Sequence, residues 1–269
     1  MRAALGRERL AQAVTAAVAE ACVQLGCSPD SIEFEAACLG FTGGIADKEV
    51  VLREVIRTRY MLVTDDVTIA LAGAHEDGTG IVTIAGTGSV AMARNSSGNT
   101  ATAGGWGYMF GDDGAAWGIV RDALRAAFRW KEGWGPSTQL HDLFLQQSGD
   151  ADIHVFRRRL YTEDYSRPRI ASFSRLVSDA ARDGDEVAIE VLKTAAESLA
   201  ILTGVVRDRV FPPSRTVDAA YAGGTFASAI LLDPYRRKVE RDYNVRVVEP
   251  RHNATIGALL EAIRRGQAR

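Results

Sequence analysis

The sequence lacks the marks of a membrane protein, a secreted protein or a nucleic-acid binder. No apolar run approaches the roughly 20 residues that cross a bilayer. The amino-terminal residues also lack the continuous apolar stretch of a secretory signal. The net charge of the 269 residues is only −2, whereas nucleic-acid-binding domains usually carry a clear basic excess. We therefore expect neither a membrane nor a nucleic acid among the partners.

Cysteine is scarce, and its spacing fits neither a disulfide framework nor a metal site. Cys22, Cys27 and Cys38 are odd in number and form no Cys-x-x-Cys pair. This usage is typical of reduced cysteines in a cytoplasmic protein. The composition, 46% hydrophobic and 25% charged, is that of an ordinary globular chain, long enough for two modest domains.

Apolar periodicity predicts strands that alternate with helices, which indicates an α/β fold. Expected helices cover residues 10–25, 47–59, 67–74, 112–130, 187–210, 225–241 and 254–265, and expected strands cover 32–39, 60–63, 81–85, 90–93, 217–222 and 245–248. The polar, glycine-containing residues 75–80 mark a boundary. We expect an amino-terminal domain at 1–78 and a second at 79–269, with a helical insertion at about 137–184.

Two glycine turns follow apolar strands and are candidates for phosphate binding. The first is Gly86-Thr87-Gly88-Ser89, and the second is Gly223-Gly224. Glycines in a turn let successive backbone N–H groups point outward, and such concave sets of amides bind anions. Taken alone, the first pattern indicates only a hairpin turn. Together, the two turns suit a nucleotide held by its phosphates at one and near its base at the other.

Carboxylates and one aromatic residue each have a structural and a functional interpretation. Asp65 or Asp66 follows a strand and either caps the next helix or deprotonates a hydroxyl nucleophile. Asp112 and Asp113 either favour a helix start or bind a sugar hydroxyl or hydrated Mg²⁺. Trp106, between glycines, is either a core residue or the wall of a sugar site.

Three motifs, IAGTGS, AGGWGYMFGDDGAAW and AGGTF, together resemble one known group of proteins. The group is the N-acetylglucosamine kinase-like branch of the BadF/BadG/BcrA/BcrD ATPase family, within the actin, Hsp70 and sugar-kinase superfamily. This resemblance implies a two-domain actin-like ATPase (ribonuclease H-like) fold with ATP and Mg²⁺ in a cleft. It further implies transfer of the γ-phosphate to the 6-hydroxyl of N-acetylglucosamine or glucosamine.

The resemblance assigns roles to individual residues. Asp66 matches the catalytic aspartate of the family. The positions that match sugar-binding residues are Thr42, Thr87, Gly105, Trp106 and Asp112. The positions that match nucleotide-binding residues are Gly86, Thr87, Gly88, Ser89, Gly223 and Gly224. No residue is assigned as a metal ligand, and which carboxylates orient Mg²⁺ stays open.

One expected motif is absent from the sequence. The kinases that the chain resembles begin with a hairpin carrying an Asp-Gly-Gly-Gly-Thr-type loop for the β- and γ-phosphates, and no such loop precedes the first helix here. We therefore expect a first domain that is incomplete at its amino terminus, from a fragment or a late start codon. If the chain is natural as given, we expect weak ATP binding and little or no kinase activity.

Two other functions compete with a sugar kinase at this point. One is a degenerate, sugar-binding regulator that keeps the sugar pocket without turnover. The other is an ATPase that activates a radical dehydratase, which needs cysteines that bridge an iron–sulfur cluster between subunits. The spacing of the three cysteines does not favour the second alternative. For assembly, a homodimer is an alternative to a monomer.

Overall fold

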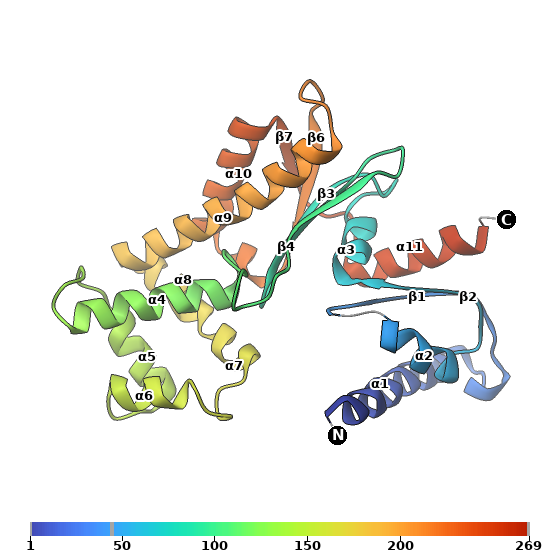
Figure 1. Ribbon diagram of the computed structural model, residues 1–269, viewed down its shortest axis with the longest axis horizontal. Coiled ribbons are helices and arrows are strands. Elements are labelled where there is room, and N and C mark those ends of the chain that lie inside the picture. The colour runs from blue at the N-terminus through green and yellow to red at the C-terminus, as the bar shows by residue number, and fades with distance from the viewer. Residues whose placement is uncertain (1, 44–45, 268–269) are drawn as a thin grey trace. The chain divides into compact units, whose positions relative to one another are not determined.

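Two units make up the chain in the computed structural model, which describes residues 2–43 and 46–267 (Figure 1). The first unit comprises residues 1–78 and 251–269, and the second comprises 79–250. The boundary after residue 78 coincides with the expected one. Residues 251–269, expected in the second domain, instead belong to the first unit, because the last helix packs on elements of that unit.

The first unit is built on a pair of parallel strands. Its elements are α1 (Arg2–Leu25), the 3₁₀ turn η1 (Pro29–Ser31), β1 (Phe34–Phe41), α2 (Ala46–Val55), β2 (Thr58–Asp65), α3 (Asp66–Ala74) and α11 (Ala254–Gln267). Strands β1 and β2 pair in parallel from Phe34↔Thr58 to Phe41↔Asp65. Helices α3 and α11 lie on one side of this pair and α1 and α2 on the other (Figure 1). Both strands therefore end at the same edge.

Glycines let α3 and α11 approach closely. A Cβ added at Gly257 would lie 1.9 Å from the carbonyl oxygen of Ile69, and one added at Gly73 would lie 2.3 Å from that of Asn253. Real Cβ atoms do not come so close to backbone, so only glycine permits this packing. The peptide before α11 is also fixed, because the His252 amide donates to the carbonyl of Gly73.

The second unit contains a five-stranded mixed sheet with the order β5-β4-β3-β6-β7. Its strands are β3 (Gly80–Ala85), β4 (Ser89–Arg94), β5 (Thr100–Gly104), β6 (Val217–Ala222) and β7 (Val245–Val248). Its helices are α4 (Ala116–Lys131), α5 (Leu140–Ser148), α6 (Ile153–Arg159), α7 (Arg167–Ser172), α8 (Ser174–Arg182), α9 (Glu186–Val210), the 3₁₀ turn η2 (Gly224–Ala227) and α10 (Ala229–Tyr243). Strands β3, β4 and β5 are antiparallel, whereas β6 runs parallel to β3 and β7.

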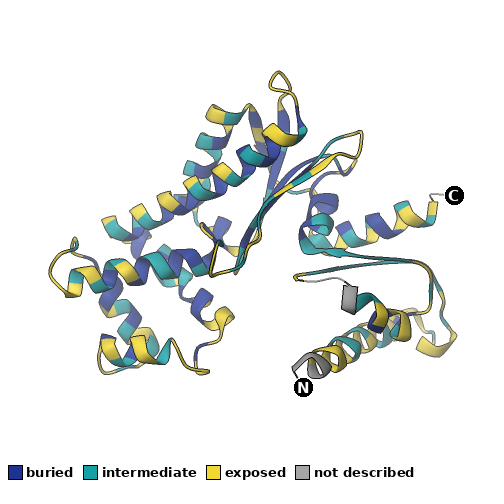
Figure 2. Cartoon of the chain, in the orientation of Figure 1, coloured by how far each residue is buried: buried dark blue, intermediate teal, exposed yellow. Residues whose placement is uncertain are grey.

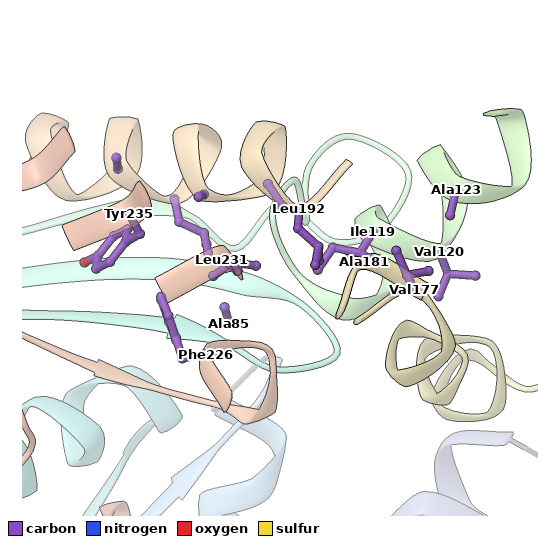
Figure 3. Close-up of a cluster of buried hydrophobic side chains, with 14 of the residues drawn as sticks. Ala85, Ile119, Val120, Ala123, Val177, Ala181, Leu192, Phe226, Leu231 and Tyr235 are labelled. Carbon is purple, nitrogen blue, oxygen red and sulfur yellow. The ribbon is translucent and has the colours of Figure 1, made fainter. Parts of the chain in front are cut away.

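The hydrophobic core of the second unit lies where α9 and α10 cover the sheet and where α4 meets α8 (Figure 3). Leu192, Leu231 and Ile119 belong to this continuous cluster of buried side chains. Buried polar groups in it are paired, since the Thr203 hydroxyl lies 2.7 Å from that of Thr83 and 3.0 Å from that of Tyr235. Strand β3 is almost fully buried, whereas β1 and β2 of the first unit are mostly half-buried (Figure 2).

Two details of the second unit differ from the sequence-based expectation. Strand β5 was not expected, because its sequence TATAG has small residues and no strong apolar alternation. Helix α4 begins at Ala116 rather than at Asp112, for a reason that lies in the glycine turn described below. Within the described ranges, no helix combines the length and the apolar character that a membrane crossing requires.

Candidate functional site

Thr42 and Asp66 meet at the carboxyl edge of the two parallel strands in the first unit. The register pairs Phe41 with Asp65, so the residue that follows each strand lies at the same level. The Thr42 hydroxyl donates a 2.6 Å hydrogen bond to Oδ2 of Asp66. Loops at this edge of an α/β sheet commonly carry ligand-binding groups. The pair therefore presents a hydroxyl and a partly exposed carboxylate together.

The structure separates the roles of the two adjacent aspartates. Asp65 is the N-cap of α3, with extended backbone, and its carboxylate accepts a 2.8 Å hydrogen bond from the Thr68 amide. Helix capping is therefore accounted for by Asp65. Asp66, in the first turn, directs its carboxylate to Thr42 instead. The Lys48 ammonium donates to the carbonyl of Thr42 at 2.8 Å and places a positive charge near the pair.

The Gly86–Ser89 turn lies against the amino terminus of α4 in the second unit. The amides of Ala116 and Trp117 donate to the carbonyls of Gly86 and Thr87, at 2.9 and 3.4 Å. The loop thus caps α4, which has no side-chain cap. This contact explains why the helix begins at Ala116, and it shows that Asp112 and Asp113 do not start it. Within the described residues, the amides of Thr87 and Gly88 have no hydrogen-bond partner.

The two glycine turns, distant in sequence, touch each other. A Cβ at Gly223, whose φ is +107°, would lie 2.3 Å from the carbonyl oxygen of Ala85 and 2.8 Å from the amide nitrogen of Gly86. The Thr225 hydroxyl donates to the same Ala85 carbonyl at 2.7 Å. Adjacent parallel strands β3 and β6 carry the turns at their carboxyl ends. The two turns therefore lie side by side at the carboxyl ends of neighbouring strands in this unit.

A pocket of ≈ 850 Å³ opens beside the two turns, entirely within the second unit. Gly86, Thr87 and Gly224 of the two turns line it. Its remaining walls come from α4, α7, α8, η2 and the start of α10: Ala116, Ile119, Pro168, Ala171, Ser172, Ser174, Arg175, Ser178, Asp179, Arg182, Thr225, Ala227, Ser228, Ala229 and Ile230. This volume lies in the range that accommodates a drug-sized ligand or cofactor.

Sequence reasoning missed the polar wall that α8 contributes to this pocket. Arg175, Ser178, Asp179 and Arg182 follow the spacing i, i+3, i+4 and i+7, so they share one face of the helix. Val177, Ala180 and Ala181 on the same helix are buried. The polar stripe is visible in the sequence, but it is equally typical of a solvated helix face, so the sequence does not identify it as a pocket wall.

Of the residues expected on the sugar side, Thr87 lines the pocket, whereas Gly105, Trp106 and Asp112 belong to the same unit but do not line it. Thr42 belongs to the first unit. The Gly105 amide donates to the carbonyl of Ser89 at 2.8 Å. The side chain of Trp106 is 76% exposed, which excludes the core interpretation. Asp112 is buried, with a left-handed φ of 61°, and its carboxylate accepts from the Ser89 amide at 3.1 Å.

The described part of the chain offers no dedicated cage of protein ligands for a metal ion. Among the described residues, no three His, Cys, Asp or Glu side chains lie together as potential ligands. Asp113, one candidate, forms a 2.7 Å ion pair with Arg121. Cys22, Cys27 and Cys38 are free thiols in the first unit.

Comparisons with known proteins point to one family. The model of the BadF/BadG/BcrA/BcrD ATPase family matches residues 2–262. An N-acetylmuramic acid/N-acetylglucosamine kinase of Clostridium acetobutylicum is 31% identical over 240 residues, which cover 86% of this chain and 78% of the relative. An N-acetyl-D-glucosamine kinase of Dictyostelium discoideum is 26% identical over 239 residues, covering 84% of this chain and 74% of the relative.

The fold matches that of a solved structure of a bacterial protein. A candidate N-acetylglucosamine kinase from Chromobacterium violaceum superposes with a TM-score of 0.79 at 24% identity, covering 96% of this chain and 86% of the other. At this identity the likeness establishes the fold alone. The fold is accordingly the actin-like, ribonuclease H-like α/β architecture that the sequence motifs implied.

Proposed function

Because the chain belongs to the BadF/BadG/BcrA/BcrD ATPase family, we propose that it is an ATP-dependent kinase that phosphorylates the 6-hydroxyl of N-acetylglucosamine or glucosamine. The observation that carries the proposal is the contact between the two glycine turns, both of which contribute residues to the lining of one pocket. The two curated relatives reported above, both named as kinases of N-acetylated amino sugars, support the choice of substrate.

ATP fits the pocket by volume and by backbone chemistry. The added Cβ atoms at Gly86 and Gly224 would meet nothing within 4 Å, so phosphate or ribose can approach the backbone there. The amides of Thr87 and Gly88 have no partner in the described part of the chain, and such amides bind phosphate oxygens. Ser89 and Gly223 are the neighbouring nucleotide-binding residues of the two turns. Gly224 and α8 contact the adenosine.

Asp66 is the proposed general base. In phosphoryl transfer the protein mainly positions the reactants, stabilises charge and accepts the proton of the attacking hydroxyl. The Thr42 hydroxyl, bonded to Oδ2, fixes the orientation of the carboxylate, so Oδ1 is the oxygen that takes the sugar proton. Asp65 is occupied by the helix cap and does not take this role.

For the sugar, we propose contacts with Thr87, Gly105, Trp106 and Asp112 of the second unit, and Thr42 of the first unit keeps the sugar-side role that the resemblance assigns to it. The exposed ring of Trp106 offers an apolar face on which a pyranose ring can pack. Mg²⁺ enters with ATP, because the described residues hold no ready three-ligand cage and this ion usually binds through phosphates and one or two carboxylates. We place the reaction in the cytoplasm, which suits the free thiols.

A sugar panel tests the proposal. ADP release is followed in a coupled assay with ATP, Mg²⁺ and one of N-acetylglucosamine, glucosamine, N-acetylmuramic acid or glucose, and calorimetry measures the binding of each sugar alone. We expect the highest kcat/KM of the panel with N-acetylglucosamine or glucosamine. Sugar binding without any ADP release would instead favour the non-enzymatic regulator. Equal turnover with glucose would contradict the assignment to an amino sugar.

A further inference from the structure

The carboxylate of Asp112 lies at the centre of a buried network beside the glycine turn. Its side chain is 4% exposed. One oxygen, Oδ1, accepts the Ser89 amide at 3.1 Å, and it lies so close to Gly88 that a Cβ there would approach it to 2.5 Å. The Ser89 hydroxyl donates in addition to the carbonyl of Asp113 at 2.9 Å. These hydrogen bonds therefore connect the Gly86–Ser89 turn to Asp112 and Asp113, which precede α4.

The other oxygen of Asp112 faces Arg167, the first residue of α7. Nη2 of Arg167 lies 3.4 Å from Oδ2. The same guanidinium lies 4.8 Å from the ring centroid of Tyr108, whose ring packs edge-to-face against Trp117 at 5.0 Å. Pro168, Ala171 and Ser172 of the same helix form part of the pocket wall. Arg167 thus links that wall to the glycine turn through Asp112.

We propose that Arg167 is a positioning residue for nucleotide binding, which holds the Asp112 carboxylate so that Asp112 in turn fixes the Gly86–Ser89 turn. This inference rests on the proposed function, because it gives the turn a nucleotide to bind. A buried carboxylate without a counter-charge is unfavourable and would tend to rotate out of its buried position. This movement weakens the hydrogen bond to the Ser89 amide. The Thr87 and Gly88 amides would then lose the fixed orientation that makes them a preorganised phosphate site.

The test compares Arg167→Gln with a matched control on the same helix, Arg169→Gln. The control also removes a guanidinium, which lies over the Tyr165 ring at 4.2 Å and donates to the carbonyl of Asp164, away from the turn and outside the pocket lining. Arg167→Lys keeps the charge. The first readout is hydrogen exchange of the nucleotide-free chain over residues 84–92. The second is ADP affinity, measured by displacement of a fluorescent ADP analogue.

The inference predicts that Arg167→Gln speeds exchange of the turn amides about tenfold, the scale of a lost hydrogen bond to a charged group. It also predicts that the variant weakens ADP binding about tenfold, while Arg167→Lys recovers part of both effects and Arg169→Gln changes neither. In turnover, the KM for ATP rises while kcat changes less than twofold. Because Arg167 acts through Asp112, the double variant Asp112→Asn/Arg167→Gln should bind ADP little more weakly than either single variant.

The outcomes separate this inference from the proposed function. If the unaltered chain binds no ADP, the proposed function fails, and the exchange measurement still decides whether Arg167 holds the turn. Equal exchange over residues 84–92 in Arg167→Gln and the unaltered chain would overturn the inference. So would an Arg169→Gln variant that loosens the turn as much as Arg167→Gln does.

Discussion

Replacing Gly223 by alanine should force apart the two glycine turns of the second unit. The new Cβ would lie 2.3 Å from the Ala85 carbonyl oxygen and 2.8 Å from the Gly86 nitrogen, and the φ of +107° is unfavourable for alanine. Backbone strain of this kind costs about 1–3 kcal/mol, and overpacking costs a further 1–3 kcal/mol or so. We therefore expect a loss of roughly 3–5 kcal/mol in the free energy of unfolding.

Gly224→Ala is the matched control, because its Cβ would meet nothing within 4 Å and its φ is not left-handed. It should change the free energy of unfolding by less than about 0.5 kcal/mol, yet reduce ADP affinity, since the methyl group enters the pocket. Urea unfolding followed by tryptophan fluorescence measures stability. The four tryptophans, Trp106, Trp117, Trp130 and Trp134, all lie in the second unit, so the signal reports on it alone. Equal stability of Gly223→Ala and Gly224→Ala would refute the described contact.

Further predictions concern the first unit. Thr42→Val removes the 2.6 Å hydrogen bond to Asp66 and should lower kcat about tenfold with little change in the KM for ATP, whereas Thr42→Ser should not; a loss confined to KM would contradict the orienting role. Burial, and to a smaller extent the nearby Glu261 carboxylate, raises the pKa of the Cys38 thiol to about 11. At pH 8, iodoacetamide should therefore alkylate Cys38 in the folded chain roughly a hundredfold more slowly than in the chain unfolded in urea, and the rate in the folded chain should rise towards pH 11. Equal rates, read by peptide mass spectrometry, would contradict this. Gly257→Ala should speed hydrogen exchange in α3, because the new Cβ meets the Ile69 carbonyl at 1.9 Å; unchanged exchange would mean that the close packing of α11 on α3 is not required.

The sequence predicts the strand-end positions of the candidate site because they depend on local patterning. Apolar runs followed by polar residues indicate strands whose carboxyl ends carry Thr42 and the two aspartates, and the register of β1 and β2 agrees. The sequence does not predict which of Asp65 and Asp66 caps α3 and which one contacts Thr42. Either carboxylate can cap a helix. Asp65 is the cap because its backbone is extended, and the carboxylate of Asp66 instead accepts a hydrogen bond from the Thr42 hydroxyl.

Long-range contacts set the features that local patterning misses. The start of α4 depends on the carbonyls of Gly86 and Thr87, about thirty residues earlier in the chain, so acidic residues before the helix are misleading. The return of α11 to the first unit depends on packing against α3. Gly257 in the middle of a helix is a signal of such close packing, because glycine there is otherwise unfavourable, but it does not identify the partner.

The most direct test of the central claim is sugar-dependent ADP formation by Asp66→Asn compared with Asp65→Asn. The two variants make the same chemical change at adjacent positions, and asparagine can still cap α3 at position 65. The account predicts that Asp66→Asn lowers kcat by about two to four orders of magnitude, the contribution of a general base, with the affinity for N-acetylglucosamine largely kept. Asp65→Asn should retain a kcat close to that of the unaltered chain. Sugar-dependent turnover that survives in Asp66→Asn but disappears in Asp65→Asn would contradict the account.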